Sequence, residues 1–215
     1  MDKLKQFLTG IFLTIFVISL SVVVTLNFRT LYYHDMQAYH LAERYGYTEE
    51  EVRENYDALI DYNSVFNHED LNFPTLPMSE NARIHFVEVK RIFVAIASIL
   101  LPLGLIGSIA GILLNRGKRP WYLLISTIFS LGIPALLGIA MAIDWWGVFV
   151  TFHHIAFNND YWLFDSATDP IIDLLPDEFF MHCLMMILGI IALWSIISLV
   201  IFIRSKKKYA SSRSK

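Results

Sequence analysis

The chain has 215 residues, of which 55% are hydrophobic and 14% aromatic, and its formal net charge is −3. This apolar share is well above that of a soluble globular domain and predicts an integral membrane protein. The single cysteine excludes an internal disulfide and any CxxC redox chemistry.

Four apolar windows are long enough to cross the bilayer hydrocarbon, which takes about 20 residues of helix. They predict transmembrane helices at residues 7–28, 92–114, 121–143 and 179–203. The first window follows a basic start but is longer than a secretory signal core and lacks a cleavage site, so we interpret it as an uncleaved anchor. The predicted fold is an all-α membrane protein with a single membrane domain over residues 1–215.

Lysine and arginine gather in three segments: before the first span, in "NRGKRP" between the second and third spans, and after the fourth. The positive-inside rule places all three segments in the cytoplasm. The connections 29–90 and 144–178 then form a mostly helical extracellular cap, and the second carries seven acidic residues but no lysine or arginine. We therefore expect a multi-pass protein of the cell membrane with both termini cytoplasmic. The short basic clusters beside the membrane favour contact with the lipid bilayer, and no nucleic-acid partner is expected.

The first outer connection contains an amphipathic helix. "YTEEEVRENYDALIDYNSVF" begins with Thr48, and Glu51 three positions later completes a capping-box pattern. Val52 and Tyr56 follow at helical spacing, which indicates one apolar face.

"SENARIHFVEVKRIF" predicts a second outer helix that leads into the second span, with Ser79 or Asn81 as its N-cap. On this helix His85 and Glu88 share a face. The Glu88 carboxylate could therefore accept a hydrogen bond from the His85 imidazole and fix its tautomer. The same spacing also suits an ordinary solvated surface pair.

The segment "FHHIAFNNDYWLF" follows the third span and contains His153 and His154. His85, His153 and His154 share one depth, where the cap meets the membrane, and this indicates a common site. A metal site is conceivable, but adjacent histidines on a regular helix rarely converge on one ion, so we expect no metal and no cofactor. HExxH, CxxC, HxxxxD, GxSxG and P-loop motifs are absent.

These residues leave three functional classes open: an enzyme, a small transport or channel subunit, and a non-catalytic membrane sensor or scaffold. Transporters usually carry ionisable groups at mid-membrane depth, and the predicted spans lack them.

Several motifs resemble the lipoprotein intramolecular transacylase family of Gram-positive bacteria, over nearly the whole chain. They are "ARIHFVEVKRIF" before the second span, the Phe-His after the third, the Asn-x-x-Trp of Asn159 to Trp162, and the Asp-Pro…Leu-x-Pro…Phe-Phe of Asp169 to Phe180. The resemblance implies two catalytic histidines at the outer membrane surface, here His85 and His153. Many relatives have Asp where this chain has Glu88, so the reach of that carboxylate differs.

The implied reaction transfers the sn-2 acyl chain of a diacylglyceryl group to the α-amino group of the N-terminal cysteine of a lipoprotein, which gives the lyso form. An acid/base pair of histidines suits this chemistry, because the amine must lose a proton and the glycerol oxygen must gain one. We expect His85 to act as the base, oriented by Glu88, and His153 to act as the proton donor. The expected supporting residues are Glu88, His154, Asn158 and Asn159, and aromatic pocket walls are expected from Trp145, Trp146, Phe149, Phe152, Phe157, Tyr161 and Trp162.

Overall fold

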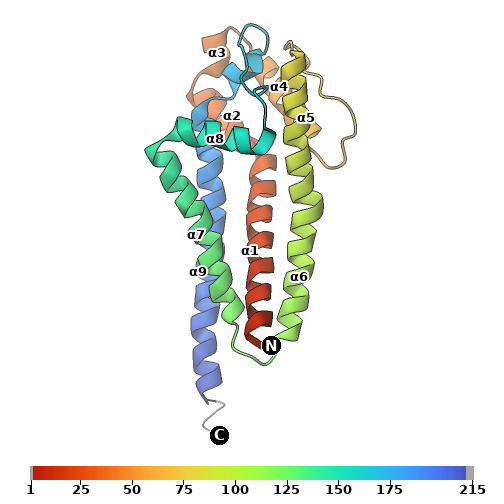
Figure 1. Cartoon of the computed structure of the whole chain (residues 1–215). Helices are drawn as coiled ribbons and strands as arrows, with labels where there is room; N and C mark the ends of the chain where they lie inside the picture. Colours follow the sequence, from red (N-terminus) through yellow and green to blue (C-terminus); the bar gives the residue numbers. More distant parts are fainter. Residues whose placement is uncertain (1, 212–215) are drawn as a thin grey trace. The chain divides into compact units, whose positions relative to one another are not determined.

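The computed structural model describes residues 2–211, with side chains described for residues 2–205, and every regular element in this range is helical (Figure 1). The elements are α1 (Asp2–Asn27), α2 (Arg29–Ala38), α3 (Leu41–Tyr45), α4 (Glu49–Tyr62), α5 (Glu80–Ala95), the π-helix η1 (Ile96–Leu100), α6 (Leu101–Leu114), α7 (Trp121–Ile143), α8 (Trp145–Phe157), the 3₁₀-helix η2 (Pro170–Leu174) and α9 (Asp177–Ser211).

Four helical stretches are long and apolar enough to cross a membrane: Asp2–Asn27, Glu80–Leu114, Trp121–Ile143 and Asp177–Ser205. The predicted class, an all-α protein with four membrane-spanning helices, is confirmed. The second stretch runs without a break through α5, η1 and α6, so the helix that carries His85 is continuous with the apolar segment after it.

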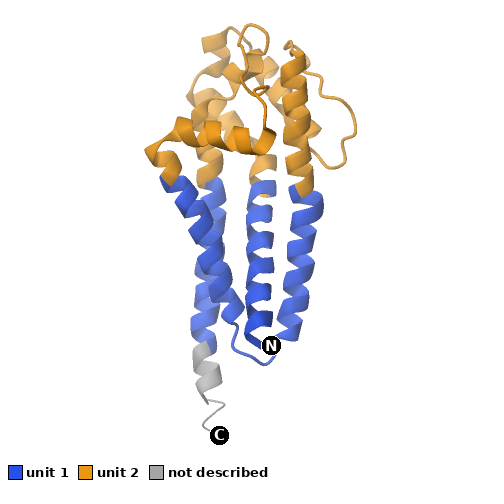
Figure 2. Ribbon diagram, viewed as in Figure 1, with its two compact units in different colours: residues 1–23, 96–139, 186–215 blue, residues 24–95, 140–185 orange. Residues whose placement is uncertain are grey.

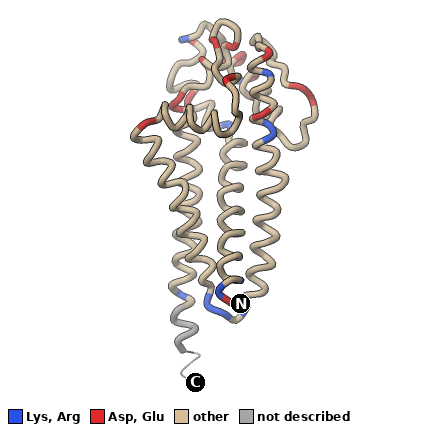
Figure 3. Tube along the Cα trace, in the orientation of Figure 1, with Lys and Arg blue, Asp and Glu red and all other residues tan. Residues whose placement is uncertain are grey.

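The chain forms two compact units (Figure 2). Unit 1 contains residues 1–23, 96–139 and 186–215, and unit 2 contains residues 24–95 and 140–185. By the sequence, nineteen of the 20 acidic residues belong to unit 2, whereas eleven of the 17 basic residues belong to unit 1. Figure 3 shows where the charged residues of the described part lie. The two units therefore carry charge of opposite sign.

Within unit 1, glycines let α6 pack closely on α1. A Cβ atom added at Gly104 would lie 2.5 Å from the backbone nitrogen of Phe16, and added Cβ atoms at Gly107 and Gly111 would meet the side chains of α1. Small residues of this kind allow the backbones of membrane helices to approach one another.

The core of unit 2 is built on stacked aromatic rings. Tyr32 of α2 stacks on Tyr56 of α4 with ring centroids 3.6 Å apart, and Phe179 of α9 meets both rings edge-on. The Tyr32 hydroxyl donates to the Leu174 carbonyl at 2.8 Å. Buried aromatic rings with satisfied hydroxyls contribute strongly to packing, so these contacts tie α2, α4, η2 and α9 together.

Both predicted helix caps in unit 2 are present. Thr48 Oγ1 accepts a hydrogen bond from the Glu51 N–H, and Glu51 accepts one from the Thr48 N–H, which confirms the capping box. At the start of α5, Ser79 Oγ accepts from the Ala82 N–H at 3.1 Å. The Ser79 N–H in turn donates to the buried Asp169 at 2.6 Å, and this fixes the helix that carries His85 to the segment after α8.

Candidate active site

Two helices of unit 2 bring His85 and His153 together. His85 comes from α5 and His153 from α8, which runs crosswise to α5 (Figure 1), and their ring centroids are 6.0 Å apart. The segment "WWGVFVTFHHIAF" forms α8 because Asp144 caps it, its side chain accepting from the Gly147 N–H at 2.8 Å.

His153 is held by a backbone carbonyl and enclosed by aromatic rings. Its Nδ1 lies 2.7 Å from the carbonyl oxygen of Phe149. A carbonyl only accepts, so Nδ1 carries the proton, and in the neutral ring Nε2 keeps its lone pair. The rings of Phe149 and Trp162 lie 4.0 and 4.6 Å from the imidazole, centroid to centroid.

Burial lowers the pKa of His153 below its ordinary value of 6.5. The hydrogen bond to the Phe149 carbonyl opposes this shift by raising the pKa, and the neighbouring His154 lowers it further. The imidazole is therefore neutral near pH 7 and can accept a proton at Nε2.

His85 is buried, with 7% of its surface exposed, and its environment is also aromatic. Phe157 and Phe164 meet its ring edge-on at 4.7 and 5.5 Å, and Phe86 lies 5.9 Å away. Within residues 2–205, the Nδ1 atom of His85 has no hydrogen-bond partner. Buried polar atoms are usually satisfied, so the unpaired nitrogen of this buried ring, whose centroid lies 6.0 Å from that of His153, needs an explanation.

The neighbouring His154 faces away from His85. Its side chain is 54% exposed and its Nδ1 lies 3.9 Å from Asp160. Adjacent positions on a helix point about 100° apart, since the helix has 3.6 residues per turn. The structure thus brings His153, and not His154, to His85.

Glu88 does not hydrogen-bond to His85, which corrects the expected pairing. Its two carboxylate oxygens instead accept from the side-chain amide of Asn159, at 3.0 and 3.2 Å. The same amide donates to the Phe157 carbonyl at 2.9 Å. The Asn159 carbonyl accepts from the indole N–H of Trp162 at 2.9 Å. Glu88 and Asn159 therefore hold the segment that presses Trp162 against His153.

The remaining predicted residues lie at different distances from the histidines. Phe152 and Phe157 contact the His153 ring, at 5.3 and 5.6 Å. Trp145 and Trp146 stack on Phe149, and 60% of the Trp146 surface is exposed. Asn158 is the C-cap of α8 and has a left-handed backbone and an exposed side chain. Tyr161 lies in the turn after α8 and is also exposed.

Two features of the site were missed by reasoning from the sequence. The first is the Phe149 carbonyl as the partner of His153, because a backbone acceptor leaves no signal in the residue types. The second is Phe86, whose ring lies beside His85 and between Phe73 and Phe164. Its position next to His85 in the chain was the only available signal.

Comparisons with known proteins identify the family of this chain. The family model for lipoprotein intramolecular transacylase Lit matches residues 7–180. The structure of the membrane-integral lipoprotein intramolecular transacylase Lit from Bacillus cereus superposes with a TM-score of 0.91 at 34% identity, covering 98% of each chain.

Two further structures of the Bacillus cereus protein carry the H85R and H85A mutations. Both superpose with a TM-score of 0.87 at 34% identity; the H85R structure covers 99% of this chain and 95% of its own, and the H85A structure 98% and 96%. No curated protein matched the chain in sequence. The expected resemblance is confirmed: the chain belongs to the lipoprotein intramolecular transacylase family and is a membrane-integral acyltransferase.

Proposed function

We propose that this enzyme moves the acyl chain from the glycerol sn-2 oxygen to the α-amino group of the N-terminal cysteine of a diacylglyceryl-modified lipoprotein. The product is the lyso-form lipoprotein. The observation that carries the proposal is the pair of neighbouring imidazoles in an aromatic enclosure, with ring centroids 6.0 Å apart.

The reaction needs the substrate to fold back on itself. Counting from the amine nitrogen through the cysteine, the sulfur and the glyceryl carbons to the ester carbon gives an eight-membered ring in the transition state. Closing this flexible ring costs orientation entropy, which a rigid enclosure can reduce in advance. The rings of Phe149, Phe157, Phe164 and Trp162 surround both histidines and suit acyl and glyceryl carbons. The same rings exclude the water that would otherwise hydrolyse the ester.

We assign His153 as the base, which reverses the assignment expected from the sequence. Its Nδ1 is occupied by the Phe149 carbonyl, so Nε2 is the atom available to take the amine proton during attack on the ester carbon. The earlier assignment depended on Glu88 orienting His85, and Glu88 bonds to Asn159 instead.

His85 is then the group that delivers a proton to the departing glycerol oxygen. The amine loses one proton to His153, the glycerol oxygen gains one from His85, and transfer from His153 to His85 restores both neutral rings. Proton transfer through positioned side chains contributes about 10²–10⁴-fold to such rates. The ring centroids are 6.0 Å apart, so a substrate atom held between the two rings can complete the transfer.

Glu88 and Asn159 serve as positioning residues in this proposal. They act through Trp162, which is 6% exposed and packs on the His153 ring. Metal chemistry is not part of the proposed mechanism, which uses only the two imidazoles and the substrate's own amine.

We further propose that both termini are cytoplasmic and that the site faces outward, where lipoprotein anchors reside. The supporting observation is the charge separation, with eleven basic residues in unit 1 and nineteen acidic residues in unit 2.

The test uses purified enzyme and a synthetic diacylglyceryl-cysteine lipopeptide. Transfer leaves the intact mass unchanged, so the readout is loss of amine reactivity together with fragments of an N-acylated cysteine. We expect His85→Ala and His153→Ala each to lower the rate by about 10²-fold or more. The matched control, His154→Ala, should stay near the wild-type rate. A fully reactive amine after long incubation with the wild-type enzyme would refute the proposed reaction, and equal losses at His153 and His154 would refute the assignment.

A further inference from the structure

The most exposed large hydrophobic side chain among the described residues lies far from the histidine site in sequence. Phe66 is 88% exposed, and it sits in the connection between α4 and α5. Exposed apolar residues on the membrane-crossing helices have an obvious partner in lipid. Phe66 instead belongs to the connection between α4 and α5, outside the membrane-crossing helices.

Hydrogen bonds within the turn order the backbone around Phe66, while its ring stays exposed. The Phe66 N–H donates to Ser64 Oγ at 3.3 Å, and the Asn67 N–H donates to the Ser64 carbonyl at 3.2 Å. The Glu69 N–H donates to Asn67 Oδ1 at 2.8 Å. These bonds satisfy the backbone on both sides of Phe66, so the turn is ordered by its own contacts and leaves the ring outside.

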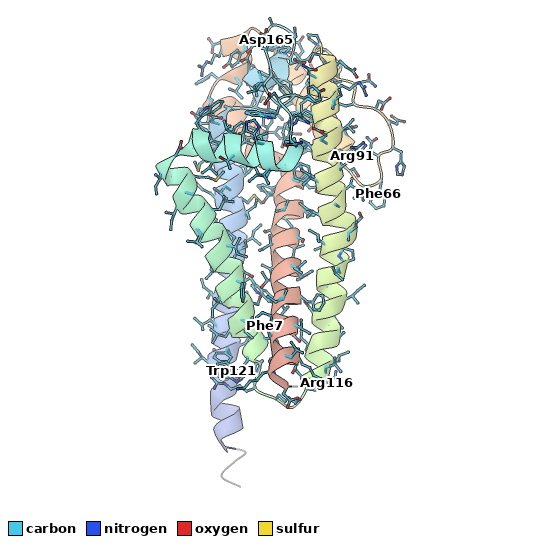
Figure 4. The ribbon with its side chains drawn as sticks, viewed as in Figure 1. Phe7, Phe66, Arg91, Arg116, Trp121 and Asp165 are labelled. Atoms are coloured by element: carbon cyan, nitrogen blue, oxygen red, sulfur yellow. The ribbon has the colours of Figure 1, made fainter. Side chains whose placement is uncertain are left out.

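The turn lies beside the end of α5. Tyr62, the last residue of α4, receives the Lys90 ammonium over its ring at 4.0 Å, only four residues before Phe66. Figure 4 shows Phe66 at the level of the end of α5 and Arg91, whereas Asp165 lies at the opposite end of unit 2. Phe66 thus lies at the level where the sequence of α5 becomes apolar.

The sequence of α5 marks this level as a boundary between polar and apolar surroundings. Lys90 and Arg91 are its last charged residues, and no charged residue follows until Arg116. Arg91 is exposed, and within residues 2–205 it forms no salt bridge. A cation followed by a long apolar helix is the pattern found where a chain passes through the phosphate layer of a bilayer.

We propose that the turn at Ser64–Asn67 is a membrane-contact site, in which Phe66 enters the headgroup region of the bilayer and Arg91 pairs with lipid phosphate. The partner is the phospholipid surface itself. Aromatic rings favour this zone because their apolar bodies are removed from water there. The acidic residues Glu69 and Asp70 follow the turn, so attraction to anionic lipid does not drive membrane binding here. The driving contribution to binding is the removal of the Phe66 ring from water. This contact would add a second attachment of unit 2 to the bilayer, besides the helices that enter the membrane.

The test measures the depth of a nitroxide label at position 66 in phosphatidylcholine vesicles. Phe66→Cys is made in a Cys183→Ala background, which removes the only native cysteine. Asp165→Cys is the matched control, an exposed connection residue of the same unit. We expect the label at position 66 to collide with dissolved oxygen and to lose collisions with a water-soluble nickel chelate, and the label at position 165 to show the reverse.

Equal collision with the chelate at both positions would overturn the proposal. Protection at position 66 that appears only at high protein density in the vesicles would identify a second copy of the chain as the partner, and would also overturn it. If Cys183→Ala prevents folding, the same labels are measured with Cys183 in place, and the signal of labelled wild-type protein is subtracted.

Discussion

The imidazole of His153 owes its proposed role to two local contacts. The Phe149 carbonyl fixes the proton on Nδ1, and the surrounding rings keep the imidazole neutral near pH 7. Both contacts favour a base at Nε2. The neighbouring His154, one position away in the chain, is instead 54% exposed, and its Nδ1 lies 3.9 Å from Asp160.

We expect kcat/KM for a lipopeptide substrate to fall in two stages as the pH is lowered. The substrate amine has a pKa of about 8 and must be neutral, which gives a first limb of slope about one. His153 must also be neutral, and its lowered pKa means that the slope steepens only below 6.5. Initial rates measured by fragmentation across the acidic range test this expectation.

The variant His154→Gln provides the control for that profile. It removes a charge that lowers the pKa of His153, so the steeper limb should begin at a higher pH, nearer to 6.5. A steeper limb that begins above 6.5 in the wild-type enzyme would contradict the assignment of His153 as the base.

Glu88 offers a test of the positioning role. Glu88→Gln keeps a side-chain oxygen that can accept from Asn159, whereas Glu88→Ala removes both acceptors. Since a hydrogen bond to a charged group is worth about 1.5–3 kcal/mol, we expect kcat/KM to fall about tenfold or more in the alanine variant and much less in the glutamine variant. Identical rates for the two variants would show that the amide–carboxylate contact does not support His153.

At the scale of elements, the packing of α1 on α6 depends on glycine. We expect Gly104→Ala to destabilise the protein by about 1–3 kcal/mol, because its Cβ would meet the Phe16 backbone, which cannot move aside as a side-chain tip can. Gly132→Ala in α7 is the control. Apart from the backbone of its own helix turn and its chain neighbours, no described atom lies within 4 Å of a Cβ added there. Thermal unfolding of the detergent-solubilised variants measures both, and equal midpoints would contradict the close-packing argument.

The sequence was most informative where the structural cause is local. The capping box of Thr48 and Glu51 was predictable because its partners are three residues apart. The segment of α8 was harder, because "WWGVFVTFHHIAF" is apolar on all sides and shows no helical periodicity. The choice between His153 and His154 depends on how α8 is rotated against α5, and no local pattern reports that rotation.

Glu88 illustrates the same limit. A spacing of three residues makes contact with His85 possible, but the outcome was decided by Asn159, which is 71 positions away in the chain. The family resemblance identified the two histidines as partners, whereas the hydrogen bonds that distinguish their roles are tertiary and were not predictable.

At the scale of the whole molecule, the charge separation predicts an orientation in the membrane. We expect Asp165→Cys, in the Cys183→Ala background, to react with a membrane-impermeant maleimide on intact cells. Lys118→Cys in the "NRGKRP" loop should react only after the membrane is opened. Labelling of Lys118→Cys but not Asp165→Cys on intact cells would place the site in the cytoplasm and contradict the proposed orientation.

The proposal that the paired histidines carry one acyl chain from oxygen to nitrogen within a single substrate is tested most directly by isotope labelling. A lipopeptide with a deuterated chain at the sn-2 position is incubated with the wild-type enzyme, and the product is fragmented. The account predicts deuterium on the cysteine nitrogen and an unlabelled chain on the glycerol, and no transfer by an enzyme carrying both His85→Ala and His153→Ala. Deuterium that stays on glycerol, or transfer that persists in the double variant, would contradict it.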